Sequence, residues 1–192
     1  MTGKDLLETV TLMGFAKTLE HNEEYFFRAA NLSLSRICRS FPLFGEIILS
    51  PKANESYDIA TLTDDFLGFP ASFLSERQGN GGHICPLFLT EGRDFTVKGS
   101  TVLFLRDTDA PITLHYIRRA HTLTVDNVDA ALDIHPIAES LLPLLTASYL
   151  WLDDRGDLAT QYLTLYRSES EELKKLLYRH GGIHITSNGW DR

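Results

Sequence analysis

The spacing of apolar residues changes twice along this chain, and that change most constrains its fold. In residues 1–42 and 136–180, apolar side chains recur every three or four positions, as on one face of an α-helix. Residues 43–135, in contrast, hold short runs rich in β-branched and aromatic residues, separated by turn residues. The pattern predicts an α+β fold with an N-terminal helical hairpin, a β-rich insertion and a C-terminal helical hairpin.

The N-terminal segment predicts two helices. Gly14 follows the first helix and suits the left-handed position that often ends one. Asn22 is a good N-cap for the second helix, which is expected to run up to Pro42. The predicted apolar faces are Leu6, Leu7, Val10 and Met13 in the first helix, and Phe26, Ala29, Ala30, Ser33, Leu34, Ile37 and Phe41 in the second.

The middle segment predicts an antiparallel β-sheet of four or five strands. Residues 98–100 read as a hairpin turn, residues 78–82 as a flexible tip, and Thr63–Phe69 as a helical turn or a loop. The strand at Ile112–Arg118 alternates in polarity and is expected to be half-buried. The predicted strands are Gly45–Ser50, His83–Thr90, Asp94–Lys98, Thr101–Leu105 and Ile112–Arg118, and Ser56–Ile59 is a candidate for a further short extended piece.

The C-terminal segment follows an irregular linker at 120–135. An interior proline costs about 3 kcal/mol in a helix, so we expect Ser140 as N-cap and Pro143 in the first turn. A tight loop at 153–156 should lead into a last helix about 30 Å long. Its predicted face is Leu158, Tyr162, Leu165, Tyr166, Glu169, Leu173 and Leu176. The bundle would thus have about four helices, and residues 181–192 would form an extended arm.

The composition of the chain argues against several classes of protein. A chain of 192 residues fits one structural domain. Its net charge of −8 makes it a poor clamp for nucleic-acid phosphates, and residues 43–135 hold thirteen acidic residues against seven basic ones. No apolar run reaches the length of a membrane span. Cys38 and Cys85 are too few for a disulfide framework, so we expect reduced thiols in an intracellular compartment.

The sequence predicts no catalytic, cofactor or metal site, because each candidate fits an ordinary structural role better. His83 and Cys85 lack the second ligand pair that structural zinc needs. His180 and His184 have helical spacing, but glycines interrupt the helix between them. Nucleophile-elbow, phosphate-loop and dinucleotide-binding motifs are absent from the sequence. The remaining candidates also fit structural roles. Four acidic residues are expected in turns, namely Asp64, Asp65, Asp153 and Asp154. Four aromatic residues are expected in the helix core, namely Tyr149, Trp151, Tyr162 and Tyr166.

Four stretches carry a family resemblance. They are the opening helix Asp5–Phe15, the helix from Arg28 to Ile37, the strand Ile112–Ala120 with the following Thr122–Thr124, and the run Leu141–Asp154 with Ala159, Tyr162 and Tyr166. The last is the strongest: a small-residue helix, an acidic turn and an Ala/Tyr helix. With the order of hairpin, insertion, hairpin and tail, they resemble the head–tail connector (adaptor) proteins of tailed bacteriophages and prophages, over roughly the whole chain.

The resemblance implies a structural role rather than an enzymatic one. It implies a ring, commonly of twelve copies, in the virion neck, assembled in the host cytoplasm, with the portal protein above and a tail or stopper protein below. Double-stranded DNA would pass through the ring without specific binding, and no membrane is implied. An acidic channel suits this role, because it repels the duplex and lets it slide.

The resemblance also directs attention to the arm. Connector arms often dock into a neighbouring subunit or the portal, and Ile183, Ile185 and Trp190 are our candidate partner-binding residues. Strand addition would supply backbone hydrogen bonds, and tryptophan is a common interface anchor. Five phenylalanines of the β-rich insertion either fill its core or supply a second contact surface: Phe66, Phe69, Phe73, Phe88 and Phe104. The alternatives are another connector layer (a stopper or tail-completion protein) or a small-ligand-binding or enzymatic domain without a recognisable motif.

Overall fold

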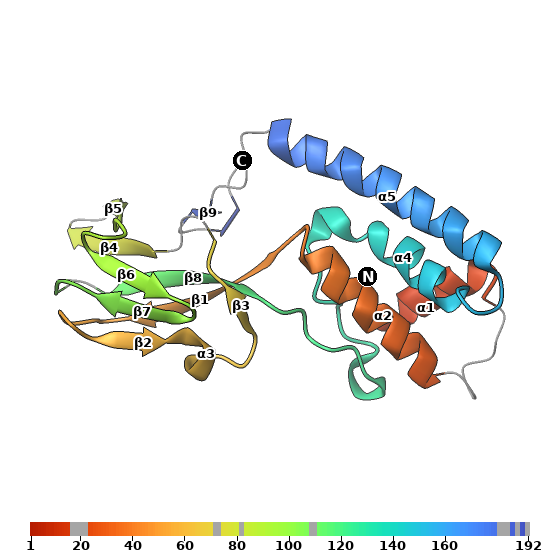
Figure 1. Cartoon of the computed structure of the whole chain (residues 1–192), viewed down its shortest axis with the longest axis horizontal. Helices are drawn as coiled ribbons and strands as arrows, with labels where there is room; N and C mark the ends of the chain where they lie inside the picture. The colour runs from red at the N-terminus through yellow and green to blue at the C-terminus, as the bar shows by residue number, and fades with distance from the viewer. Residues whose placement is uncertain are drawn as a thin grey trace. The chain divides into compact units, whose positions relative to one another are not determined.

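The chain forms an α+β fold, as predicted, but it divides into two compact units rather than one (Figure 1). The computed structural model describes residues 1–15, 23–70, 74–80, 83–107, 111–179, 185–186 and 189–190. Of the described residues, the helical unit comprises 1–42 and 120–179, and the β unit comprises 43–119, to which 185–186 and 189–190 are also assigned. Each end of the chain therefore contributes helices to one unit, and the β unit is inserted between them in sequence.

A central helix organises the helical unit. Its elements are α1 (Gly3–Leu12), α2 (Glu23–Cys38), the 3₁₀ turns η2 (Val125–Asn127) and η3 (Pro136–Ala138), α4 (Leu141–Leu150) and α5 (Gly156–Arg179). Helices α1, α2 and α5 all pack against α4. Eight of the ten residues of α4 are buried, because it is apolar on every side. The apolar stripe predicted for α2, from Phe26 to Phe41, is buried as expected.

The C-terminal end of α1 confirms the predicted role of Gly14. Gly14 has φ of 101° and donates its N–H to the carbonyl of Thr11 (3.0 Å). Phe15 donates to the carbonyl of Val10 (3.3 Å), which completes a Schellman motif with a buried aromatic after the glycine. The Tyr162 hydroxyl of α5 donates to the carbonyl of Met13 (2.8 Å), so the last helix also caps the first.

Replacing Gly14 with alanine is expected to destabilise the helical unit by roughly 1–2 kcal/mol, the cost of left-handed backbone in an L-residue. Space is not limiting, since the nearest atom to an added Cβ would be Cζ2 of Trp151 at 3.6 Å. Denaturant unfolding measures the change. Gly156→Ala is the control, because Gly156 has no atom within 4 Å of its added Cβ and no positive φ. Equal stability of the two variants would contradict this prediction.

The start of α4 accommodates Pro143 in the way that was predicted. The helix begins at Leu141, so Pro143 lies in its first turn and displaces no intrahelical hydrogen bond. Ser140 occupies the N-cap position, but its hydroxyl makes no cap hydrogen bond and instead donates to Glu169 of α5. The polar contact thus ties the two C-terminal helices together.

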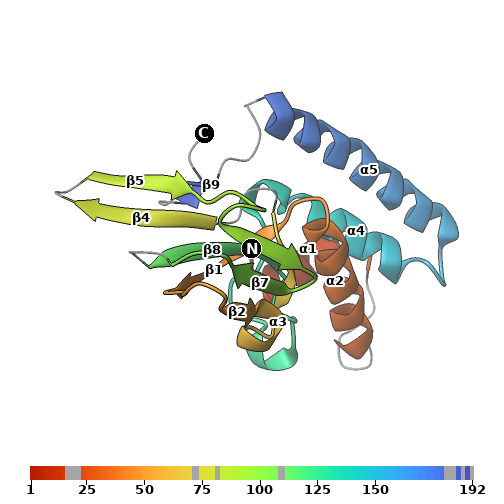
Figure 2. The same cartoon turned by 60° about the vertical axis from the view of Figure 1, so that its left-hand side comes forward.

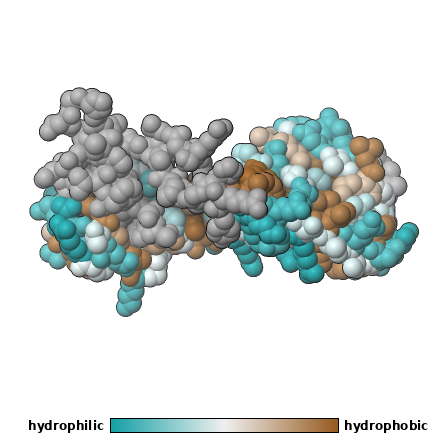
Figure 3. Space-filling view, turned by 90° about the horizontal axis from the view of Figure 1, so that it is seen from above, coloured by the Kyte–Doolittle hydropathy of each residue, from teal (hydrophilic) through white to brown (hydrophobic). Residues whose placement is uncertain are grey.

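Helix α5 buries most of its predicted face, but two of the seven predicted residues are exposed. Leu165 and Leu176 were expected to face the core, yet they are 47% and 45% exposed. Tyr166 and Ser170 are buried, with Leu163, Leu173 and Leu177 partly buried beside them. The view onto α5 in Figure 3 shows apolar patches that interrupt its hydrophilic surface.

Residues 120–135 are irregular, as predicted, but they belong to the helical unit and not to the β-rich insertion. The side chain of Asn31 on α2 forms two hydrogen bonds with the backbone of Leu123 (2.9 and 2.8 Å). The chain start pairs with the same segment, since Thr2 bridges Ala131 and Lys4 donates to the carbonyl of Val128 (3.1 Å). These contacts end the β unit at Arg119, sixteen residues before the predicted boundary at 135.

The β unit contains two antiparallel sheets where one was predicted. In the larger sheet the order is β1-β8-β4-β5, with β3 also paired to β8, and in the smaller it is β2-β7-β6. The elements are β1 (Leu43–Leu49), β2 (Ser56–Asp58), α3 (Ile59–Leu62), β3 (Phe66–Gly68), β4 (Leu74–Asn80), β5 (His83–Phe88), β6 (Phe95–Lys98), β7 (Thr101–Phe104) and β8 (Ile112–Arg118). Figure 2 shows the β4–β5 ribbon beside β8. The predicted turn between β6 and β7 is present, with Gly99 at φ of 63°.

Two local predictions in this unit were wrong. The helical turn lies at Ile59–Leu62, where a strand end was expected, and Phe66–Gly68 is a strand that pairs with β8. Strand β8 is buried on both faces from Ile112 to Tyr116 and not half-buried. It lies at the centre of its sheet, between β1 on one side and β3 and β4 on the other.

Both sheets share one core. Phe104 of the smaller sheet and Ile112 and Leu114 of the larger are fully buried in it, and Phe66 and Phe69 pack against it. The aromatic residues whose side chains are described therefore fill the core, one of the two roles considered for them. Phe73 lies outside the described residues. Strand β1 pairs with β8 along its whole length, from Leu43 opposite Arg118 to Leu49 opposite Ile112.

Candidate functional site

The predicted partner-binding residues lie at the C-terminal end of the chain. Ile185 belongs to β9 (Ile185–Thr186) and Trp190 to β10 (Gly189–Trp190). These two strands pair with each other, and Trp190 is opposite Ile185. Ile183 lies outside the described residues. In the isolated chain, the backbone edge proposed for strand addition is thus partly used in a two-stranded hairpin.

The residues considered for chemistry are not brought together. His83 and Cys85 lie on β5, while His180 and His184 are outside the described residues. Across the described part of the chain, no group of three His, Cys, Asp or Glu side chains could hold a metal ion. No helix in this part is long and apolar enough to span a membrane. Asp65 and Asp153 accept hydrogen bonds from the hydroxyls of Tyr116 (3.0 Å) and Tyr25 (3.3 Å), which gives both a structural role.

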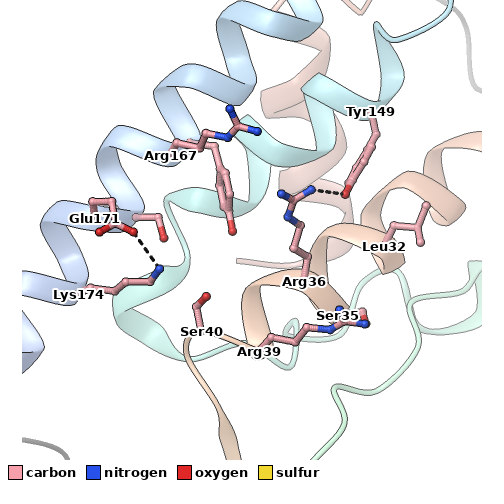
Figure 4. Close-up of a pocket in the computed structure, with 11 residues that line it drawn as sticks. Leu32, Ser35, Arg36, Arg39, Ser40, Tyr149, Arg167, Glu171 and Lys174 are labelled. Atoms are coloured by element: carbon pink, nitrogen blue, oxygen red, sulfur yellow. Dashed lines mark hydrogen bonds and ion pairs between the residues drawn. The ribbon is translucent and has the colours of Figure 1, made fainter.

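A basic groove lies between α2, α4 and α5 (Figure 4). Its volume is about 600 Å³, and it lies entirely within the helical unit. Its lining residues, here called the basic groove, are Leu32, Ser35, Arg36, Arg39 and Ser40 from α2 and the turn after it, Tyr149 from α4, and Tyr166, Arg167, Ser170, Glu171 and Lys174 from α5.

The groove is positive within an acidic chain. It gathers four cationic side chains, from α2 and α5, and one carboxylate. That carboxylate, Glu171, is paired with Lys174 (3.0 Å), as expected for an i,i+3 pair on a helix. In the part of the chain that the structure describes, the exposed side chains of Arg39 and Arg167 have no hydrogen-bond or ion-pair partner. Their charge is therefore available to a ligand.

Arg36 is held in place by the aromatic side of the groove. Its guanidinium donates to the Tyr149 hydroxyl (3.2 Å), and this hydrogen bond raises the pKa of Arg36 above its usual value. A further, smaller interaction with Tyr166 acts in the same direction. The guanidinium is therefore charged and oriented before any ligand arrives.

Two buried hydroxyl side chains complete the groove. Tyr166 is only 5% exposed and Ser170 only 4% exposed, yet both line it. Among the described residues, neither hydroxyl has a hydrogen-bond partner. Both hydroxyls can therefore donate to a polar ligand in the groove, beside the four cations.

The chemistry of the groove suits an oxyanion. Guanidinium groups bind carboxylates and phosphates through two parallel hydrogen bonds, and a hydroxyl can donate a third. With its one carboxylate paired to Lys174, the described lining offers donors and positive charge rather than a general base. The arrangement fits binding better than proton transfer.

Sequence reasoning did not find this groove. The helix-core role predicted for Tyr149, Trp151, Tyr162 and Tyr166 is confirmed, since all four pack in the helical core. However, Tyr149 and Tyr166 also line the groove. The signal was a basic edge on each wall: Arg36 on α2 with Arg39 in the turn after it, and Arg167 with Lys174 on α5.

No protein-family model matches the chain, and no curated protein matches it in sequence.

Proposed function

We propose that this chain is a structural head–tail adaptor of a tailed bacteriophage or prophage. Its copies would form a ring, commonly of twelve, beneath the portal and around the DNA channel. The observation that carries this proposal is the architecture of the helical unit. Helices from both chain ends surround α4, with a β unit inserted between them, in the arrangement that the resemblance implies.

The charge of the chain supports the same role. A net charge of −8 on each copy makes a ring strongly negative. Such a surface repels the DNA duplex, whereas capture would require Lys and Arg to displace counterions from the phosphates. DNA would therefore pass the ring without being held.

Surface leucines support contacts between copies. A ring closes through heterologous contacts, which need apolar surface outside the subunit core. Leu152, Leu165 and Leu176 on the helical unit are all exposed. We further propose that Ile183, Ile185 and Trp190 attach the C-terminal segment to a neighbour or to the portal by strand addition.

The direct test mixes the protein with the portal protein of the same virus and images the particles by electron microscopy. We expect a ring beneath the portal, with its copy number set by native mass spectrometry. A ring that binds only a further connector layer would indicate a stopper or tail-completion role, and a chain that never associates would remove the adaptor proposal.

A deletion variant tests the arm separately. Removing residues 183–192 should leave the circular dichroism spectrum and the unfolding midpoint nearly unchanged, because terminal segments add little to core packing. It should abolish attachment to the ring or the portal. Unchanged assembly would disprove the role of the arm while leaving the adaptor proposal in place.

A further inference from the structure

We infer that the basic groove binds carboxylate side chains of a second copy of this chain, supplied by the turn at residues 124–130. This inference rests on the proposed ring only for the identity of the partner. The groove offers four cations and the hydroxyl groups of Tyr166 and Ser170, and a second copy with a net charge of −8 necessarily brings acidic surface.

A protein carboxylate fits the groove better than a nucleic-acid phosphate. Four cations and one paired carboxylate make a local positive site in a chain that is negative as a whole. A long duplex would experience the repulsion of the entire acidic surface, whereas a short acidic segment interacts mainly with the groove within a Debye length.

The turn at 124–130, here called the acidic turn, has the matching chemistry. Asp126 and Asp129 are exposed, and among the described residues their side chains have no partner. Val125, beside them, is 59% exposed. Two carboxylates and a valine complement the unpartnered Arg39 and Arg167 and the exposed Leu32 of the groove, so charged and apolar contacts can form together.

The acidic turn is also rigid, which lowers the cost of binding. Asn127 accepts from the backbone N–H of Thr124 (2.7 Å) and donates to the carbonyl of Thr122 (2.9 Å). Two hydrogen bonds from Asn31 to Leu123 fasten the start of the turn to α2. A preorganised ligand loses less conformational freedom when it binds.

Groove and turn lie on different sides of the same unit. Helix α5, which forms one wall of the groove, and the 120–135 segment lie on opposite sides of the α2–α4 pair in Figures 1 and 2. Contact between them therefore joins unlike surfaces of two copies and leaves one groove and one turn open at the ends. Such a heterologous contact closes into a ring when the rotation per copy permits.

The test reverses charges on each surface. Variant R39E/R167E reverses the groove, and both arginines lack partners, so the fold should be kept. Variant D126K/D129K reverses the turn. Self-association is measured by sedimentation velocity in solution and by ring formation on the portal. Each variant should raise the dissociation constant of self-association by at least about tenfold, because like charges then face each other in the contact.

Restored pairing distinguishes a direct contact from general electrostatics. The four-substitution chain should regain most of the lost affinity, since the reversed surfaces attract again. Mixing the two double variants should also give hetero-oligomers, because each supplies the intact surface that the other lacks. The matched control for R39E/R167E is K98E/K175E, which makes the same change in net charge at exposed lysines outside the groove and should associate as the wild type does.

The outcomes separate this inference from the proposed function. A ring that forms on the portal despite both reversals would overturn the inference and leave the adaptor role intact. Charge-swapped self-association without any ring on the portal would support the inference and count against the adaptor. A wild type that associates neither in solution nor on the portal overturns the inference. So does a fluorescent DNA duplex that binds the wild type and is released by R39E/R167E.

Discussion

Leu145→Ala is expected to destabilise the helical unit by about 2–5 kcal/mol, the range for deleting a buried leucine side chain. Leu145 is fully buried on α4, the helix against which α1, α2 and α5 pack. No other element can fill the space without moving against the rest of the core. Since domains are stable by only about 5–15 kcal/mol, this one change removes a large fraction of the total.

Denaturant unfolding followed by circular dichroism at a helix wavelength measures the loss. Hydrogen exchange should quicken in α4 and in the helices that pack on it. Leu152→Ala is the matched control, because Leu152 follows the same helix but is 63% exposed, so its truncation should cost less than about 0.5 kcal/mol. Similar costs for the two variants would show that α4 is not the core helix.

Gly45→Ala is expected to destabilise the β unit by about 1–3 kcal/mol or more through overpacking. An added Cβ at Gly45 would lie 2.3 Å from Cζ and 2.5 Å from the hydroxyl oxygen of Tyr116, the residue directly opposite on β8. The ring cannot easily move away. It is 6% exposed, its hydroxyl donates to Asp65 (3.0 Å), and it packs against Phe66 at 6.0 Å between centroids.

Gly68→Ala is the control for this substitution. Gly68 lies on β3, which pairs with the same strand β8, but an added Cβ there meets nothing within 4 Å. This variant should be neutral or slightly stabilising, because alanine restricts the unfolded chain. A double-mutant cycle with Tyr116→Ala should show that the cost of Gly45→Ala falls once the ring is gone. If Gly45→Ala destabilised the Tyr116→Ala variant as much as the wild type, the loss of stability would not come from the clash with the Tyr116 ring.

The helices were predictable because their signals are long and local. The stripe of α2, the glycine after α1 and the proline in the first turn of α4 each act through neighbouring residues. The face of α5 was less predictable, because Leu165 and Leu176 are apolar yet exposed. Apolar residues are common on protein surfaces, so their spacing alone does not identify the buried side.

The β unit was less predictable because its strands depend on distant partners. Residues 66–68 form a strand only because β8 offers the pairing edge. The alternating polarity of β8 suggested one exposed face, yet Thr113 and His115 are both buried. In this central strand a polar neighbour lies beside the buried histidine, since His115 Nδ1 is 3.3 Å from Oε1 of Glu46, its cross-strand partner.

The basic groove was not predictable from sequence, because its walls are far apart in the chain. Arg39, directly after α2, and Arg167 on α5 each resemble an ordinary solvated surface charge. Only the packing of both helices on α4 places them around one space. The hydroxyls of Tyr166 and Ser170 likewise belong to the groove only because of this packing.

The pairing of β1 with β8 has a consequence for how the chain folds. Leu43 lies opposite Arg118, so the two ends of the inserted unit are neighbours. During synthesis the β unit is contiguous and can fold before α4 and α5 have been made. Once the β unit has folded, its two ends are held close together, so it connects α2 and α4 as a short loop would. Docking of α4 onto α2 then carries only the small entropy cost of closing a short loop. Deleting residues 43–119 and joining the flanking ends with a few glycines should for this reason leave a chain able to form the helical unit alone.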